Sequence, residues 1–187
     1  TFISKIILDV LAILHQQCNI SYSPVLLAPT GRASKVLRDS TGYEAQTIHR
    51  GLECSSDGIF LKNTGNPFRS DVLLLDESSM LDILLARDLF SALLPPTKVI
   101  LVGDVHQLPS IEPGNVLADI IKSEEVRVLE LDVSKRQVEG SSIIRNSRLI
   151  MESQMIHSDT SLKDTYVIRK SNAAGCLKVI TDAINDV

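Results

Sequence analysis

The sequence predicts an α/β fold in which helices flank a parallel sheet. Three short apolar runs, at 25–28, 72–75 and 98–102, have the length and composition of strands buried on both faces. Between them lie segments whose apolar residues recur at helical spacing. Strands that alternate with helices are typical of a parallel sheet, because each parallel connection has to cross back over the sheet.

The helices are predicted from periodicity and from residues that end a helix. The first spans about 2–17, where Ile3, Ile6, Ile7, Val10, Leu11 and Leu14 repeat three and four positions apart. A second at 31–40 ends before Gly42, and a third at about 80–94 is broken by two prolines. Asn172 can cap the last helix. The other elements expected are helices at 47–52, 114–122, 141–151 and 172–186, and strands at 126–131 and 165–169.

Residues 54–70 differ in character from the rest of the chain. They are rich in Ser, Gly, Asn and Asp, and they surround a short apolar run at 58–61. Such a composition is typical of exposed turns. We therefore expect an exposed hairpin here rather than part of the core.

Composition excludes several classes of protein. The 44% of hydrophobic residues is enough for a core, but the net charge of −4 argues against a protein that coats nucleic acid by charge alone. The three cysteines are far apart, which favours neither a zinc site nor a disulfide framework and fits a reducing compartment. No apolar run approaches the length of a membrane span, so we expect a cytoplasmic protein with no membrane partner.

The strongest local motif is a buried strand that ends in two adjacent carboxylates, Asp76 and Glu77. Ligands of open α/β sheets bind at the carboxyl ends of the strands. There an Asp can hold Mg²⁺ and the next Glu can polarise a water for attack on a phosphate, as in a Walker B motif. The alternative is a helix start with acidic residues near its positive end.

Three more polar clusters follow predicted strands or turns. Gly103, Asp104 and Gln107 come after the strand at 98–102, where Gly103 permits close backbone approach and Gln107 can both donate and accept hydrogen bonds. The segment 29–32 begins a helix, which is a natural phosphate site. Residues 47–50 form the last cluster. Taken singly, the cluster from Gly103 to Gln107 is a polar turn and the segment 29–32 is a helix cap. Residues 47–50 allow no interpretation by themselves.

Taken together and in this order, the motifs resemble the RecD-like group of superfamily 1 DNA helicases, the family of the exodeoxyribonuclease V alpha subunit. The segment from Gly103 to Leu117 is the most specific part, and the similarity covers nearly the whole chain. The resemblance implies a RecA-like P-loop NTPase fold. The motifs that carry it are Ala28–Ala33, Thr47–Arg50, Asp76–Met80, Gly103–Ser110, Pro113–Leu117 and Arg136–Gln137.

The resemblance also implies roles for individual residues. Asp76 would bind Mg²⁺, Glu77 would activate water, and Gln107 and Arg136 would act at the γ-phosphate of ATP. Gly103 and Asp104 would belong to the same nucleotide site. The residues implied to line a path for single-stranded DNA are Pro29, Thr30, Gly31, Arg32, Thr47 and His49.

By the same resemblance, residues 1–125 would form most of a first motor domain, and 126–187 would form the junction and the start of a second. The sequence contains no GxxxxGK[ST] loop, so we expect Thr1 to lie at or just beyond that loop and this stretch alone to be inactive. His106 stands where we would expect an acidic residue.

The expected function is ATP-driven movement on single-stranded DNA, 5′ to 3′, with unwinding at duplex junctions. The hairpin at 54–70 would then act as a wedge between the strands, and other exodeoxyribonuclease V subunits would be partners. Two alternatives remain. One is a non-catalytic DNA- or protein-interaction domain that keeps the fold, and the other is a superfamily 1 helicase of different polarity.

Overall fold

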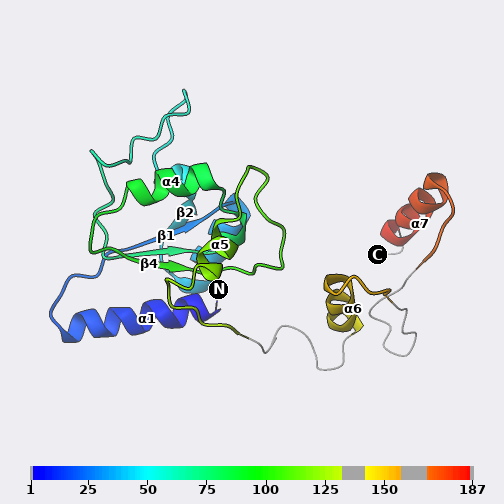
Figure 1. Cartoon of the computed structure of the whole chain (residues 1–187), viewed down its shortest axis with the longest axis horizontal. Helices are drawn as coiled ribbons and strands as arrows, with labels where there is room; N and C mark the ends of the chain where they lie inside the picture. The colour runs from blue at the N-terminus through cyan, green and yellow to red at the C-terminus, as the bar shows by residue number, and fades with distance from the viewer. Residues whose placement is uncertain (1, 132–141, 157–167, 186–187) are drawn as a thin grey trace. The chain divides into compact units, whose positions relative to one another are not determined.

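The computed structural model describes residues 2–131, 142–156 and 168–185, and the chain divides into two compact units between Val128 and Leu129. The first unit holds the sheet and most of the helices (Figure 1). Its elements are α1 (Phe2–Gln17), β1 (Pro24–Ala28), α2 (Gly31–Thr41), β2 (Ala45–Thr47), α3 (Ile48–Gly51), β3 (Val72–Leu75), the 3₁₀ turn η1 (Ser78–Met80), α4 (Ile83–Ser91), β4 (Lys98–Leu101) and α5 (Val116–Lys122). The second unit contains α6 (Ser142–Met151) and α7 (Ala173–Asn185).

Within the described residues the sheet has four strands, all parallel, in the order β2-β1-β3-β4. The register pairs Leu27 of β1 with Leu75 of β3, and Leu75 with Leu101 of β4. Ala28, at the end of β1, pairs with Thr47, at the end of β2. The loops that follow the four strands therefore leave from one edge of the sheet.

Helices cover both faces of this sheet, with α1 on one side and α4 on the other (Figure 1). Alternate residues of the strands supply the two halves of the core, as the two-residue period of a strand requires. Leu27, Leu73 and Leu75 pack with apolar side chains of α3 and α4. Leu26 and Leu74 pack with Leu8 of α1 and Leu37 of α2. The predicted α/β class, with helices flanking a parallel sheet, is confirmed.

Most predicted helices form, and their ends have identifiable causes. Helix α1 spans the predicted range, and α2 ends at Gly42, whose φ of 79° and ψ of −1° form a left-handed cap. Helix α4 is shorter than predicted and ends at Ser91. The side chain of Asn172 accepts a hydrogen bond from the Gly175 amide at 2.8 Å, so the expected cap of α7 is present.

The face of α1 that packs on the sheet differs from the apolar stripe seen in the sequence. The fully packed positions are Ser4, Leu8 and His15, whereas Ile6 and Val10 of the stripe are 47% and 49% exposed. Apolar residues occupy most of the circumference of this helix, so periodicity alone did not distinguish the buried face.

One strand was not predicted, and one strand prediction requires correction. No strand was predicted at Ala45–Thr47, where β2 forms through its pairing with β1. Residues 126–131 were expected to be a strand, but they form none, and Leu129 and Leu131 are 83% and 73% exposed. No described strand lies beside them, so the apolar run has no partner. The strand expected at 165–169 lies mostly outside the described residues.

Residues 54–70 form an exposed excursion, made of two short turns in succession. The first is closed by an antiparallel bridge between Cys54 and Phe60, and the second by one between Asn63 and Asn66. The chain then returns to the core at Phe68, which is 6% exposed and whose amide donates to the Ala92 carbonyl at 2.8 Å.

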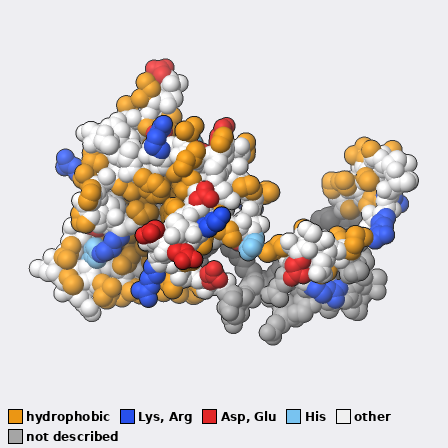
Figure 2. All heavy atoms as spheres, viewed as in Figure 1, with side chains coloured by type: hydrophobic (Ala, Val, Ile, Leu, Met, Phe, Trp, Pro, Cys, Tyr) orange, Lys and Arg blue, Asp and Glu red, His pale blue; other side chains and the backbone are white. Residues whose placement is uncertain are grey.

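The surface of the first unit carries mixed charge on the face seen in Figure 2, where acidic and basic side chains are interspersed among apolar ones. This agrees with the net charge of −4. Among the described residues no helix has both the length and the apolar character needed to cross a membrane.

Candidate functional site

Asp76 is the first residue beyond β3, and the sheet holds it in place. Its amide donates to the Leu27 carbonyl of β1 at 3.0 Å, which extends the strand pairing by one residue. Its carboxylate Oδ1 accepts a hydrogen bond from the Glu77 amide at 3.0 Å, and the residue is 7% exposed. A carboxylate fixed in this way keeps Oδ2 as a further acceptor at the edge of the sheet.

Glu77 adopts a left-handed backbone conformation, with φ 51° and ψ 40°. Residues other than Gly pay roughly 1–2 kcal/mol for this region because Cβ crowds the following carbonyl. Backbone strain of this kind clusters at functional sites, where the surrounding structure holds it. The half-buried Glu77 is therefore placed by its neighbours, and not by its own preference.

The neighbour that holds this turn is the end of β4. The Ser78 amide and the Ser78 hydroxyl both donate to the Val102 carbonyl, each at 2.9 Å. A Cβ on Gly103 would lie 2.6 Å from the Ser78 hydroxyl oxygen and 3.0 Å from the Ser79 amide nitrogen. Gly103 does permit close approach, but the described approach is to the protein's own η1 turn.

The loop after Gly103 is organised by Asp104. One carboxylate oxygen accepts from the His106 amide at 3.0 Å, and the other lies 3.5 Å from Nε2 of Gln107. The Gln107 amide donates to the Asp104 carbonyl at 3.1 Å. All three side chains are exposed, so the Gln107 amide is presented to solvent at the edge that carries the acidic pair.

The two threonines of the expected DNA path both act as helix caps. The Thr30 hydroxyl accepts from the Ala33 amide at the start of α2, and the Thr47 hydroxyl accepts from the Arg50 amide at the start of α3, each at 3.2 Å. His49 is exposed, and its ring centroid lies 5.7 Å from that of Phe60 in the excursion. This contact could not be predicted from the sequence.

The strand order divides the site residues into two neighbouring groups. Asp76, Glu77 and the loop from Gly103 to Gln107 follow β3 and β4, whereas the residues after β1 and β2 form the other group. Parallel pairing places both groups along one edge. Arg136, expected at the γ-phosphate, lies outside the described residues.

The donor set at this edge fits Mg²⁺ only with help from other ligands. In the part of the chain that the structure describes, no three His, Cys, Asp or Glu side chains gather at one point. Mg²⁺ is often held by one or two carboxylates together with phosphate and water oxygens. The fixed carboxylate of Asp76 suits that arrangement.

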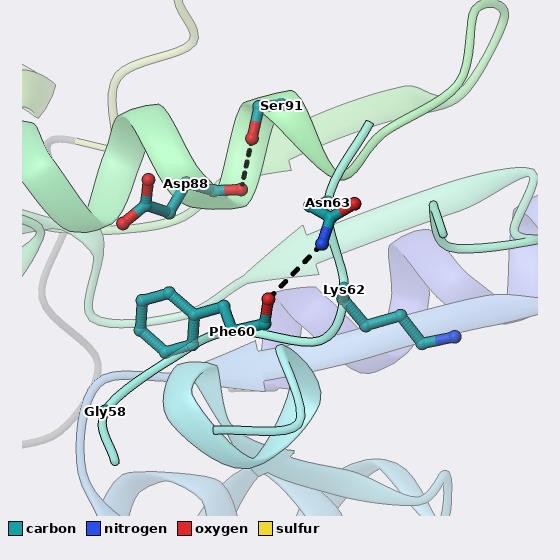
Figure 3. Close-up of a pocket in the computed structure, with 6 residues that line it drawn as sticks. All are labelled: Gly58, Phe60, Lys62, Asn63, Asp88 and Ser91. Carbon is teal, nitrogen blue, oxygen red and sulfur yellow. Dashed lines mark hydrogen bonds between the residues drawn. The ribbon is translucent and has the colours of Figure 1, made fainter. Parts of the chain in front are cut away.

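A shallow pocket of about 250 Å³ lies elsewhere, between the excursion and α4 (Figure 3). Two of the hydrogen bonds around it are internal to one segment each, from Asn63 to the Phe60 carbonyl and from Ser91 to the Asp88 carbonyl. None of its lining residues belongs to the acidic pair or to the four loops, so we do not assign it to the site.

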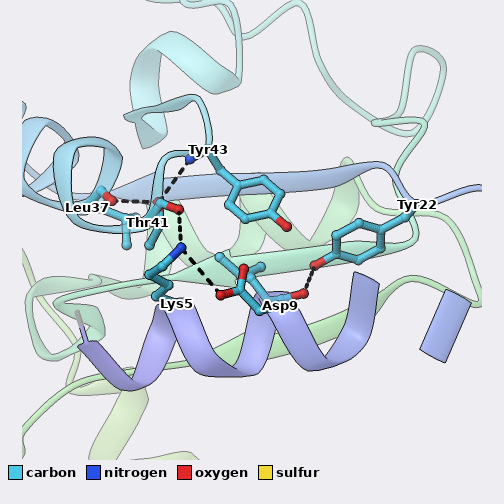
Figure 4. Close-up of polar contacts among 7 residues, drawn as sticks. Lys5, Asp9, Tyr22, Leu37, Thr41 and Tyr43 are labelled. Atoms are coloured by element: carbon cyan, nitrogen blue, oxygen red, sulfur yellow. Dashed lines mark hydrogen bonds and ion pairs between the residues drawn. The ribbon is translucent and has the colours of Figure 1, made fainter. Parts of the chain in front are cut away.

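On the opposite side of the sheet, polar contacts brace α1 against α2 (Figure 4). Lys5 lies 3.3 Å from the Asp9 carboxylate and donates to the Thr41 carbonyl at 3.3 Å. The Tyr22 hydroxyl donates to the Leu8 carbonyl at 3.1 Å. Burial, with smaller effects from Tyr43 and Asp9, raises the pKa of Tyr22 to about 12.

A parallel sheet covered by helices on both faces, with an acidic pair at the carboxyl ends of its strands, fits the RecA-like class of P-loop NTPase folds. The family model described as "AAA domain" matches residues 6–172. The chain belongs to this family.

Comparison with individual proteins confirms the resemblance to RecD-like helicases. The chain is 34% identical over 149 residues to the RecBCD enzyme subunit RecD of Mycolicibacterium smegmatis, covering 67% of this chain and 27% of that protein. It is 36% identical over 120 residues to the ATP-dependent RecD2 DNA helicase of Deinococcus radiodurans, covering 64% and 16%. The chain thus spans about a quarter or less of the length of these relatives.

A solved structure of the Pif1 helicase from Bacteroides, in complex with ADP-AlF3 and ssDNA, has a TM-score of 0.46 and 18% identity to this chain. The likeness covers 88% of this chain and 48% of that one. The fold assignment rests on the strand order and the family match, and not on this likeness.

Proposed function

We propose that this chain is part of the motor of an ATP-dependent DNA helicase, in which ATP hydrolysis drives movement on single-stranded DNA. One observation carries the proposal. The strained, half-buried Glu77 stands beside a fixed carboxylate, at the sheet edge where the Gln107 loop is also tied down. The names of the relatives, a RecD subunit and a RecD2 DNA helicase, support the same reading.

Each residue of the acidic pair has a separate task in this proposal. Asp76 would hold Mg²⁺, and the ion when bound would supply positive charge to the terminal phosphates of ATP. Glu77 accepts a proton from the attacking water or orients it. Gln107 senses the γ-phosphate through its exposed amide, and Arg136 supplies positive charge to the same group.

The loops after β1 and β2 form the DNA side of the site. The Thr30 and Thr47 hydroxyls already accept hydrogen bonds as helix caps. We therefore assign DNA contact to neighbouring polar groups that take no part in the caps. These groups are the exposed Arg32 and His49 side chains and the backbone N–H groups at the start of α2. Pro29 and Gly31 shape the turn that presents them.

The finer assignments rest on the resemblance of the sequence motifs to RecD-like helicases. We propose 5′-to-3′ movement, action at duplex junctions, and a cytoplasmic protein, with exodeoxyribonuclease V-type subunits as partners. We also propose that residues 1–125 belong to the first motor domain and that 126–187 lead into a second.

Replacing Glu77 with Gln in the whole protein tests the proposal. The variant should bind ATP with wild-type affinity, because shape and hydrogen bonding are largely kept. Its turnover should fall at least about a hundredfold, which corresponds to about 2.7 kcal/mol of barrier. A matched control is Glu44→Gln, an exposed residue before β2 at the other edge of the sheet, which should hydrolyse ATP normally. Turnover of Glu77→Gln within about threefold of wild type would contradict the role of Glu77.

A further inference from the structure

Ser79 has a buried hydroxyl with no hydrogen-bond partner. The residue is 4% exposed, and its side-chain oxygen is one of three such unpartnered oxygens among the described residues, with those of Ser4 and Ser70. Of the three, only that of Ser79 lies in the turn that follows the acidic pair. Buried hydroxyls in native proteins nearly always find a partner, so each exception requires a reason.

Its neighbour Ser78 shows what a structural serine does in the same turn. The Ser78 hydroxyl donates to the Val102 carbonyl at 2.9 Å and so ties η1 to the end of β4. Ser79 has the same side chain and similar burial, yet it gives the fold no such bond. An unsatisfied buried hydroxyl lowers stability relative to Ala, so folding alone does not account for Ser79.

Gly103, at the start of the next loop, lies close to the backbone of Ser79. A Cβ on Gly103 would come within 3.0 Å of the Ser79 amide nitrogen, so backbone meets backbone at this point. The hydrogen bonds of Asp104 all stay inside the loop, to the amides of His106 and Gln107 and to the Gln107 side chain. The part of the loop beyond Gly103 can therefore shift without losing these bonds, while the bonds from Ser78 keep Val102 in place.

We infer that Ser79 is a positioning residue of the nucleotide site, whose hydroxyl hydrogen-bonds to the backbone of the Gly103–Gln107 loop when nucleotide draws that loop toward the acidic pair. This inference rests on the proposed function. In the structure the Ser79 hydroxyl has no partner. In the inferred arrangement with nucleotide bound, the new bond holds Gln107 in register with Glu77. The free-energy cost of burying the Ser79 hydroxyl without a hydrogen bond is thus offset only when ATP is bound.

The test compares Ser79→Ala with Ser78→Ala in the whole protein, with Ser79→Cys as a conservative variant. Without nucleotide, Ser79→Ala should melt at or slightly above the wild-type temperature, whereas Ser78→Ala should melt several degrees lower because it loses a formed hydrogen bond. With ATP and DNA, Ser79→Ala should lower kcat about tenfold at an unchanged KM. Ser79→Cys, with a weaker donor of similar size, should fall in between.

The outcomes separate the inference from the function on which it rests. If Glu77→Gln loses turnover while Ser79→Ala keeps kcat within about twofold of wild type, the proposed function stands and the role of Ser79 is wrong. A Ser79→Ala variant that melts several degrees lower without nucleotide would make Ser79 a structural residue, which also overturns the inference. Normal turnover of Glu77→Gln would reject both proposals.

Discussion

Glu77 and Gly103 illustrate how single residues are constrained at this site. Glu77 takes a backbone conformation that Gly or Asn would adopt more readily, and Gly103 occupies a position where any side chain would collide with η1. The two constraints are linked, because the bonds from Ser78 to Val102 hold the two turns together. A change at either residue is therefore expected to affect the geometry of the other.

Gly103→Ala should destabilise the protein by about 1–3 kcal/mol, as overpacking of a tight contact does. The new methyl group would meet the Ser78 hydroxyl oxygen at 2.6 Å and the Leu117 side chain at 2.8 Å. The control is Gly31→Ala at the first residue of α2, where a Cβ meets nothing within 4 Å and the change should be neutral or slightly stabilising. Urea unfolding measures both, and equal midpoints for the two variants would show that the Gly103 contact is unimportant.

The residue types in the sequence indicated the site, but they did not indicate which contacts each residue makes. The carboxylates after an apolar strand and the polar loop after the next strand were visible in the sequence. The reason for Gly103 was only partly visible, because its close neighbours, Ser78 and Ser79, come from another segment of the chain. The orphan hydroxyl of Ser79 could not be predicted, since the partners of a side chain depend on packing.

At the scale of elements, α1 is joined to the rest of the first unit by polar contacts as well as by Leu8. The Tyr22 hydroxyl bonds to the Leu8 carbonyl of α1, and its ring meets that of Tyr43 edge-on at 6.3 Å. Lys5 reaches across from α1 to the last carbonyl of α2. This brace connects the helix after β1 with a helix on the same face of the sheet.

The brace predicts an alkaline loss of stability that depends on Tyr22. Its pKa is raised from 10.0 to about 12 in the folded protein, chiefly by burial. The folded state thus holds a proton that the unfolded state releases earlier, so this contribution is complete below pH 10 and is lost as the pH rises through about 12. Chemical unfolding at several pH values should show a shallower decline for Tyr22→Phe than for wild type. Parallel declines would contradict the assignment.

The excursion at 54–70 is the element expected to separate DNA strands. Ile59 and Leu61 are 63% and 52% exposed on either side of Phe60, and exposed apolar side chains can wedge between base steps. Replacing both with Ser in the whole protein should reduce unwinding several-fold more than DNA-stimulated ATPase. Ile13→Ser, at a 54% exposed position of α1, is the matched control and should change neither. Equal loss of both activities in the double variant would exclude a wedge.

Helices and strands whose limits are set by their own residues could be predicted from the sequence. Strands that form only because a neighbouring strand pairs with them could not. Helix α2 has a capping Thr and a Gly stop, so its limits follow from local chemistry. Strand β2 forms because β1 lies beside it and pairs with it. Residues 126–131 form no strand, because no described strand lies beside them to pair with. Apolar runs therefore predicted the central strands and misled at the periphery.

At the scale of the whole molecule, the parallel order of the strands makes one site out of four separate loops. Sequence order separates Thr47 from Gln107 by 60 residues, but both follow strands that end at the same edge. The residues proposed to bind nucleotide and those proposed to bind DNA are adjacent there, because β1 and β3 pair directly. The loop after β3 therefore lies between the loop after β4 and the loops after β1 and β2.

In the proposed function, ATP turnover at this edge of the sheet drives unwinding of DNA. The most direct measurement is strand separation of a partial duplex by the whole protein, followed together with ATP hydrolysis, on substrates with a 5′ or a 3′ single-stranded overhang. We predict DNA-stimulated hydrolysis and unwinding of the 5′-overhang substrate, with neither when Glu77 is replaced by Gln. DNA binding without stimulated hydrolysis or unwinding of either substrate would contradict the claim and identify a non-catalytic interaction domain.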